Sequence, residues 1–245
     1  MYNLFDKLSI LCLNWRSFTG LKNLRIDIRI QLISTLTLAA CPRKGIRMKH
    51  PTLVVICGWP FSGKTTLAKG LVKLGQDNKD PVHHIDIDEV RALMVGIPYP
   101  HPNESLELMK RDATEMAMAY RLLLAGAHEN LDIGRSLIIT ATFSRKVGQQ
   151  MLLDLMAQHP NAELKFIQCV PQGDIEDEVA RRMASRGFGE GAYVGGVNSP
   201  ARYFEVKGRY DPIGLPHIKI GTWGSKNDGR LNVEMSEAVG YINNG

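Results

Sequence analysis

The fold is decided by residues 52–65, which read Thr52-Leu53-Val54-Val55-Ile56-Cys57-Gly58-Trp59-Pro60-Phe61-Ser62-Gly63-Lys64-Thr65. The first six form an apolar run rich in β-branched side chains, which is typical of a buried parallel strand. The last eight follow the pattern G-x-x-x-x-G-K-T of a phosphate-binding loop, or P-loop. Leucines then recur at helical spacing, at positions 67, 71 and 74. A strand before the loop and a helix after it are the context in which this pattern binds phosphate.

Each part of the P-loop has a physical reason. Gly58 and Gly63 let the backbone curl so that successive N–H groups point at phosphate oxygens. The helix that begins near Gly63 directs its positive end at the same anion. Lys64 adds a charge for the β- and γ-phosphates, and the Thr65 hydroxyl can bind Mg²⁺. The residues expected to bind nucleotide are Gly58, Trp59, Pro60, Phe61, Ser62, Gly63, Lys64, Thr65 and Thr66.

Bulk composition is that of an ordinary globular protein. The chain has 245 residues, of which 44% are hydrophobic and 22% charged, so a sizeable core is available. Apolar runs are all shorter than a membrane-spanning helix, and no stable membrane association is expected. The cysteines, at positions 12, 41, 57 and 169, show neither a C-x-x-C nor a Cys/His metal spacing. Reduced thiols and a cytoplasmic location are therefore predicted.

Positive charge is concentrated near the amino terminus. Residues 1–47 contain eight basic and two acidic side chains, a net charge of +6. Because the whole chain carries +5, the remainder carries −1. The part that contains the P-loop therefore lacks the basic footprint of a polynucleotide-binding domain, and nucleic acid is allowed but not favoured as a partner.

We divide the chain into a basic extension, 1–47, and a domain, 48–245. The extension has three interpretations. Translation could begin at Met48, which would make the extension an upstream artefact or a disordered tail. Leucine, isoleucine and arginine between positions 21 and 32 also form an amphipathic, membrane-surface pattern. A lipoprotein-like site, Leu38-Ala39-Ala40-Cys41, is disfavoured because its apolar region is short and Pro42 follows the cysteine.

From Met48 onward, strand and helix patterns alternate, which predicts an α/β fold with a parallel sheet covered on both faces. The expected strands are 52–57, 82–86, 137–141, 164–170 and 217–220. The expected helices are 63–74, 89–95, 103–127, 144–158, 174–185, a helix opening at 199–200, and 231–242.

Several helix ends carry recognisable signals. Gly75 is the expected C-cap of the first helix, and Asn103 and Ser144 are expected N-caps. The long helix has an apolar stripe that we assign to the core: Leu106, Met109, Ala113, Met116, Ala117, Tyr120, Leu123, Leu124 and Ala127.

A second chemical feature, Asp86-Ile87-Asp88-Glu89-Val90-Arg91, follows the second strand. Ligands of open α/β sheets bind beyond the carboxyl ends of strands, so these side chains are expected near the γ-phosphate. Asp88 is the predicted base that takes the proton of an acceptor hydroxyl, and Arg91 the predicted contact to an anionic substrate group. Asp86 could instead be the base, or could hold Mg²⁺ through water together with Thr65. The structural alternative is that Asp88 only caps a helix.

Arginines at 181, 182 and 186 lead into residues 186–199, which contain five glycines. Guanidinium groups on a closing lid can stabilise the charge of a transferring phosphoryl group. Arg182 and Arg186 lie four residues apart on one helix face and are the predicted catalytic arginines. The alternative is that these charges only complement a helix dipole.

From about Thr52 to the carboxyl terminus, the chain resembles the P-loop kinases that include polynucleotide 5′-hydroxyl kinases and zeta-toxin-like kinases. The matching pieces are Gly58–Thr65, the Asp88-x-x-Arg91 step, Ala141-Thr142-Phe143, Arg181–Arg186 in the lid position, and Tyr203–Pro212. The resemblance implies a three-layer fold with strand order 2-3-1-4-5 and a flexible lid, and ATP and Mg²⁺ as cofactors. It implies the roles given above for Asp88, Arg91 and a lid arginine, with Lys64 also catalytic.

One position departs from the family pattern. Strand three of many such kinases ends in Asp-Ala-Thr, whereas this chain has Thr140-Ala141-Thr142. A carboxylate that would help to hold Mg²⁺ through water is therefore missing from this place, which disfavours an ATPase-motor function.

The predicted function is transfer of the γ-phosphoryl group of ATP to a hydroxyl of a small molecule, a nucleotide or a polynucleotide 5′ end. Thr140 motivates an alternative, an ATP-binding regulatory module with little catalysis. A third hypothesis is a nucleic-acid-binding protein anchored through the basic extension. The acceptor is expected to be selected by the 96–105 loop and the 186–199 lid; the sequence leaves its identity and the oligomeric state open.

Overall fold

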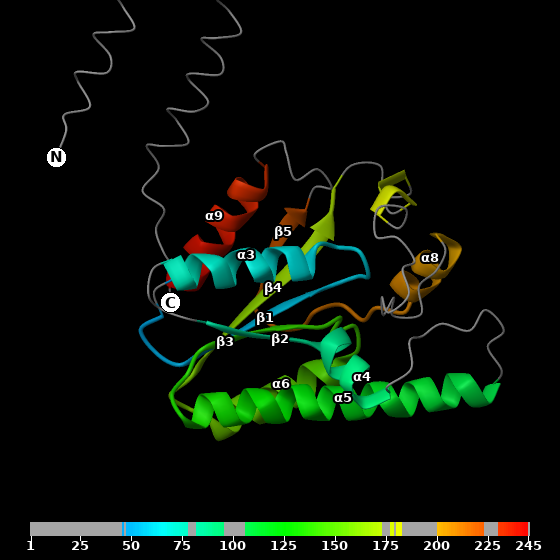
Figure 1. Ribbon diagram of the computed structural model, residues 1–245, viewed down its shortest axis with the longest axis horizontal. Coiled ribbons are helices and arrows are strands. Elements are labelled where there is room, and N and C mark those ends of the chain that lie inside the picture. Colours follow the sequence, from blue (N-terminus) through cyan, green and yellow to red (C-terminus); the bar gives the residue numbers. More distant parts are fainter. Residues whose placement is uncertain are drawn as a thin grey trace, which may run out of the picture. The chain divides into compact units, whose positions relative to one another are not determined.

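The computed structural model describes residues 46, 48–77, 82–95, 106–172, 177–178, 180–182, 200–222 and 230–244 (Figure 1). Several predictions lie outside these residues. They are the extension 1–47 apart from Ile46, the cap Asn103, the 96–105 loop, Arg186 and the 186–199 lid.

Five parallel strands form one sheet in the order β2-β3-β1-β4-β5. The strands are β1 (Thr52–Gly58), β2 (His83–Asp86), β3 (Leu137–Thr140), β4 (Glu163–Pro171) and β5 (Ile218–Thr222). β1 lies at the centre, and all seven of its residues are buried. The α/β class and the strand order 2-3-1-4-5 are therefore confirmed.

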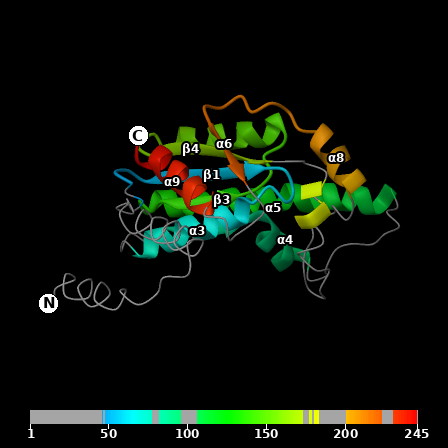
Figure 2. The ribbon, with the colours of Figure 1, turned by 90° about the horizontal axis from the view of Figure 1, so that it is seen from above.

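Helices cover both faces of the sheet and make three layers (Figures 1 and 2). One layer holds α3 (Lys64–Asp77) and α9 (Arg230–Asn243), and the other holds α5 (Leu106–Asp132) and α6 (Lys146–Gln158). The short helices α4 (Ile87–Val95) and α8 (Pro200–Gly208) lie toward the carboxyl ends of the strands. Among the helices that the structure describes, none is both long and apolar enough to cross a membrane.

Alternation along β1 divides the core in two. Leu53, Val55 and Cys57 pack with α5 and α6, whereas Val54 and Ile56 pack with α3 and α9. Successive strand residues point to opposite faces, so a central parallel strand must be apolar on both. This explains why the sequence 52–57 is a continuous apolar run. Ile46, upstream of the predicted domain boundary, is also fully buried on the α3–α9 side.

Three local predictions were wrong. Gly75 does not cap α3, which continues to Asp77 with Gly75 buried inside it, because tertiary packing outweighs the weak helix propensity of glycine. Ala117 belongs to the expected apolar stripe but is exposed. Among the α5 side chains that the structure describes, Leu123, Leu124 and Ala127 are buried as expected, and Ala119 and Leu131 are buried in addition.

The third wrong prediction is the cap of α6. The N-cap is Arg145, which makes no side-chain cap bond, and not Ser144. Asp211 supplies the missing acceptor from a distant segment, because its Oδ2 accepts the N–H of Lys146 at 2.9 Å. Its own N–H donates to the Ser144 carbonyl at 2.7 Å. A carboxylate at a helix N-terminus is stabilised by the helix dipole, so Asp211 ties the chain after α8 to α6.

Candidate active site

The P-loop uses three residues with positive φ. Gly58 and Gly63 have φ of 140° and 87°, as the motif requires, and Phe61 has φ of 60° although it is not glycine. A Cβ on Gly58 would lie 2.5 Å from the carbonyl oxygen of Cys169, on the neighbouring strand β4. Close approach of β1 to β4 and the turn of the loop therefore both demand glycine at position 58.

Lys64 points back into the loop. Its Nζ donates to the carbonyl oxygens of Gly58 at 3.0 Å and Trp59 at 2.8 Å. Burial lowers the pKa of Lys64, and the negative charge of Asp88 opposes this shift, as does that of Asp86. The structure thus brings both predicted carboxylates within electrostatic range of the P-loop ammonium.

Asp86 joins the P-loop helix to the next helix. Its Oδ2 accepts the Thr65 hydroxyl at 2.9 Å, and its Oδ1 accepts the backbone N–H of Asp88 at 2.8 Å. Since α4 begins at Ile87, the second bond makes Asp86 the N-cap of this helix. The capping role therefore belongs to Asp86 and not to Asp88, and a carboxylate lies directly beside the predicted metal-binding hydroxyl.

Thr140 lies next to this pair, in register with Asp86 on the adjacent strand. Its hydroxyl shares a hydrogen bond of 2.9 Å with Nε2 of His84. Burial lowers the pKa of His84, which favours the neutral imidazole. The carboxylate beside the P-loop threonine thus comes from the end of β2, while the end of β3 presents a hydroxyl that is bonded to a histidine.

The two predicted arginines within the described residues differ in position. Arg91, on α4, is only 2% exposed, so its guanidinium lies inside the protein. Arg182 reaches the P-loop, where Nη1 donates to the Phe61 carbonyl at 2.6 Å and Nη2 to the Thr222 carbonyl at 3.0 Å. Thr222 itself donates to the Ser62 carbonyl at 2.6 Å. Arg182 and β5 therefore brace the outer side of the phosphate loop.

Glu178 orients Arg182. Its carboxylate accepts bonds from Nε of Arg182 and, at 2.8 and 2.9 Å, from the more exposed Arg181. Partial burial raises the pKa of Glu178, but the hydrogen bonds from both arginines outweigh it and leave the pKa below its ordinary value. The carboxylate stays ionised near neutral pH, which holds Arg182 in place.

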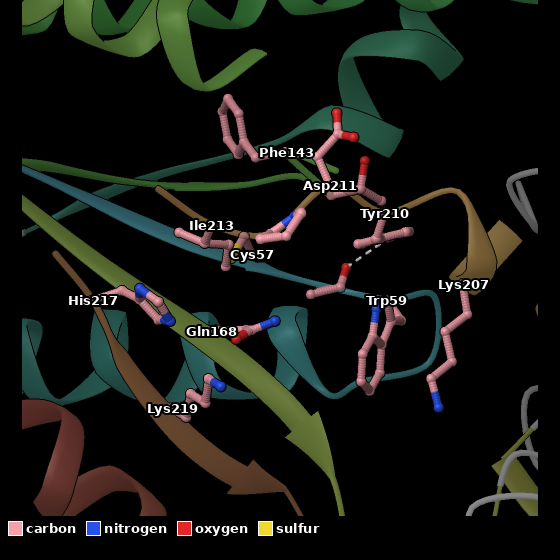
Figure 3. Close-up of a pocket in the computed structure, with 13 residues that line it drawn as sticks. Cys57, Trp59, Phe143, Gln168, Lys207, Tyr210, Asp211, Ile213, His217 and Lys219 are labelled. Atoms are coloured by element: carbon pink, nitrogen blue, oxygen red, sulfur yellow. Dashed lines mark hydrogen bonds between the residues drawn. The ribbon is translucent and has the colours of Figure 1, made fainter. Parts of the chain in front are cut away.

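A cavity of about 350 Å³ opens beside the start of the P-loop (Figure 3). Its walls come from β1 and the P-loop, the segment after β3, β4, α8 with the segment after it, and β5. The lining includes Trp59, Thr142, Phe143, Gln168, Lys207, Tyr210, Asp211, His217 and Lys219. The Tyr210 hydroxyl donates to the Gly58 carbonyl at 3.3 Å, which is also a partner of Lys64. The ammonium of Lys207 lies 4.5 Å from the centre of the Trp59 ring, a cation–π contact.

Tyr120 supports this wall from α5. Its hydroxyl shares a hydrogen bond of 2.9 Å with Thr142 and accepts the N–H of Phe143 at 3.0 Å. Its ring meets that of Phe143 edge-on, at 5.3 Å between centres. The latter residue has φ of 44°, so the hydroxyl holds a turn that a non-glycine residue rarely adopts.

Sequence reasoning missed these roles. It assigned Tyr120 to the core stripe and used Thr142 and residues 203–212 only as parts of a family pattern. The available signal was a phenol in an otherwise aliphatic stripe, since a buried tyrosine hydroxyl needs a partner. For Lys207 and Tyr210 there was no local signal, because their partners lie about 150 positions away in the sequence.

Residues 53–193 match the family described as "AAA domain". No curated protein matches significantly. A candidate kinase from Chloroflexus aurantiacus has 22% identity and a TM-score of 0.58, with 79% of this chain and 99% of that chain covered. An APS kinase from Mycobacterium tuberculosis, solved with AMPPNP and APS, has 16% identity and a TM-score of 0.51 over 79% and 98%.

The family match covers more than half of the chain, and the two solved structures align with it along nearly their whole length. The protein therefore belongs to the AAA domain family and has the fold of the P-loop kinases.

Proposed function

We propose that this protein is a kinase that transfers the γ-phosphoryl group of ATP to a hydroxyl of an acceptor. The observation that carries the proposal is the pair of hydrogen bonds from the Thr65 hydroxyl and the Asp88 backbone N–H to the Asp86 carboxylate. They join the P-loop helix to the start of α4, where the carboxylates of both Asp86 and Asp88 interact electrostatically with Lys64. A loop that only bound nucleotide would not need a second carboxylate there. A phosphoryl transferase needs one, to receive the proton of its acceptor.

The loop suits a nucleotide with Mg²⁺. Gly58 and Gly63 give the loop the curl that turns its N–H groups inward. The Lys64 ammonium donates hydrogen bonds to two backbone carbonyl oxygens, and phosphate oxygens can take their place when a nucleotide binds. Thr65 offers a hydroxyl ligand for the metal, and Asp86 can accept hydrogen bonds from metal-bound water. Bound Mg²⁺ would offset the charge of the β- and γ-phosphates.

Asp88 is the proposed base. The bond from its own N–H to Asp86 fixes the first turn of α4, and its carboxylate interacts electrostatically with Lys64. Asp88 takes the hydroxyl proton as the acceptor oxygen bonds to the γ-phosphorus, while the bond from that phosphorus to the β,γ-bridging oxygen breaks and ADP leaves with the electron pair. Lys64 and Arg182 then counter the charge that develops on the transferred group. Arg182 donates a hydrogen bond to the carbonyl of Phe61, which is itself a residue of the phosphate-binding loop.

The cavity beside Trp59 is the proposed place for the part of the acceptor that does not react. About 350 Å³ suits a small molecule or one nucleotide. Lys207, Lys219 and His217 line it, and Asp211 is engaged at the α6 N-terminus, so the walls favour an acceptor with an anionic group. Trp59 provides a ring on which a planar group can stack.

The test is an acceptor screen with radiolabelled ATP on the full chain, including nucleosides, nucleotides, sugars, sugar phosphates and 5′-hydroxyl oligonucleotides. Asp88→Asn is expected to lower transfer at least 100-fold while nucleotide binding is kept, because only proton acceptance is removed. Asp154→Asn, an exposed position on α6, is the matched control. Unchanged transfer in Asp88→Asn would refute the assignment of the base.

A second function is favoured by one observation, the bond between Thr140 and His84 at the place where a carboxylate is usual in the resembling kinases. A regulatory module would bind ATP tightly and turn nothing over. Tight binding with no transfer to any acceptor, and no transfer after Thr140→Asp, would support that function over the kinase.

A further inference from the structure

A second group of chemically active side chains lies far from the P-loop. His128 and Asp132 are on the last turns of α5, which leads into the amino end of β3. His159 directly follows α6 and precedes the amino end of β4. The P-loop follows the carboxyl end of β1, and all strands are parallel, so the two places are at opposite ends of the sheet.

The three side chains form a closed triangle. His128 Nδ1 lies 2.8 Å from His159 Nε2, and the other nitrogen of each ring faces a different oxygen of Asp132, at 3.3 and 3.5 Å. The ring centres are 4.8 Å apart. One ligand atom from each residue can be chosen so that all lie within 4.8 Å of one another.

The positions of the three residues on α5 and α6 bring their side chains together. His128 and Asp132 are four apart on α5, which places both side chains on one helix face. His159 is the C-cap of α6, where its N–H donates to the Met156 carbonyl, and its ring is buried. Asp132 is about half exposed and His128 about one-third exposed. The cluster therefore has a fixed inner ligand and an outer side that is open to solvent.

The ligand atoms of this cluster suit a divalent transition metal such as Zn²⁺. Two imidazoles and one carboxylate are common ligands of Zn²⁺, with water in the remaining position. Ligand nitrogens about 2.0–2.1 Å from a tetrahedral ion lie about 3.3 Å from each other. The imidazole pair would need to open by about half an ångström, and the Asp132 carboxylate, which faces the other nitrogen of each ring, would need to move toward that pair. Both side chains that must move, His128 and Asp132, are partly exposed and can rotate. The carboxylate brings the charge that offsets part of the ion's own.

We propose that His128, Asp132 and His159 bind one divalent transition-metal ion of the zinc type. The site ties the end of α5 to the end of α6, and so fixes where β3 and β4 begin. Its position, at the far end of the sheet from Lys64 and Asp88, makes the site independent of phosphoryl transfer.

The experiment uses the full chain, freed of metal with a chelator and titrated with Zn²⁺ or Co²⁺. We expect one ion per chain by elemental analysis, a tetrahedral Co²⁺ absorption without a thiolate charge-transfer band, and a higher melting temperature with Zn²⁺. His128→Gln and Asp132→Asn change partly exposed side chains and should fold. Each should weaken binding at least 10-fold and remove the thermal shift. The matched control is His50→Gln, an exposed histidine outside the cluster.

The proposal is overturned if the apo chain binds no Zn²⁺ at millimolar concentration, or if His128→Gln and Asp132→Asn bind as tightly as the unchanged chain. A strong thiolate-to-cobalt band would also overturn it, since it would assign the ion to cysteine. Binding that weakened equally in His50→Gln would show adsorption to surface histidines instead of a site. ATP affinity is expected to stay the same in every variant, because the cluster does not contact the P-loop.

Discussion

Replacing Gly58 with alanine tests the two reasons why the P-loop begins with glycine, which are its positive φ and the close approach of strand β4. The residue has φ of 140°, a conformation that is nearly restricted to glycine. A Cβ at this position would also lie 2.5 Å from the Cys169 carbonyl oxygen and 2.7 Å from Ser62 Oγ. The serine side chain can rotate, but the carbonyl belongs to β4, whose Cys169 pairs in register with Gly58. The strand itself would have to shift.

The magnitude follows from these two terms. A residue held in so unfavourable a region costs about 1–3 kcal/mol. Forcing an extra carbon into a packed site costs about 1–3 kcal/mol more. Together they predict a loss of about 2–6 kcal/mol in the free energy of unfolding. For a domain of about 200 residues, each kcal/mol lowers the melting temperature by about 2–4 °C.

Gly134→Ala is the matched control. Gly134 also has positive φ, 74°, but a Cβ there would meet nothing within 4 Å. It should lose only the conformational part, about 1–2 kcal/mol. Urea unfolding of the two variants, with ATP affinity measured in parallel, isolates the contact with β4. Equal losses in the two variants would refute the reasoning, because the close approach of β1 to β4 would then contribute nothing.

Two further predictions concern the neighbourhood of the site. Tyr120→Phe removes the hydroxyl that is hydrogen-bonded to the Thr142 side chain and the Phe143 N–H. It should lower the free energy of unfolding in urea by about 1–3 kcal/mol. A loss below about 0.5 kcal/mol would show that the hydroxyl does not stabilise this turn. Burial lowers the pKa of His84 below its unfolded value near 6.5, so the unfolded chain binds more protons in acid. Stability from this group is present above about pH 6.5 and declines as the pH falls toward the folded pKa. His84→Gln should flatten that decline in unfolding measured between about pH 7.5 and 5, and an unchanged slope would show that another group causes it.

Much of the fold could be predicted from local patterns. The β-branched run 52–57, the alternation of strands with helices and the P-loop signature report backbone state and buried faces, which depend on residues a few positions apart. Helix ends were less predictable. Gly75 lies inside α3, and the N-terminus of α6 is capped by Asp211 from a segment about 65 positions away.

The residues of the candidate site could also be predicted from the sequence, but their contacts could not. Lys64, Thr65, Asp86 and Asp88 could be named from the sequence, because a P-loop and the end of the next parallel strand must lie at one edge of the sheet. The bond from Thr65 to Asp86 could not be foreseen, nor could the pairing of Thr140 with His84, since register and rotamers decide which hydroxyl meets which partner.

By itself, the sequence determined a parallel α/β domain with a phosphate loop and carboxylates at one edge. Only the tertiary structure decided that Lys207 lies over Trp59, that Tyr210 bonds to the loop that holds Lys64, and that two histidines and Asp132 meet at the opposite end. The physical reason is that sequence patterns report only on interactions between residues close together in the chain. Periodicity and turn residues act over one or two turns of chain, whereas these contacts form only when elements distant in sequence pack in one arrangement.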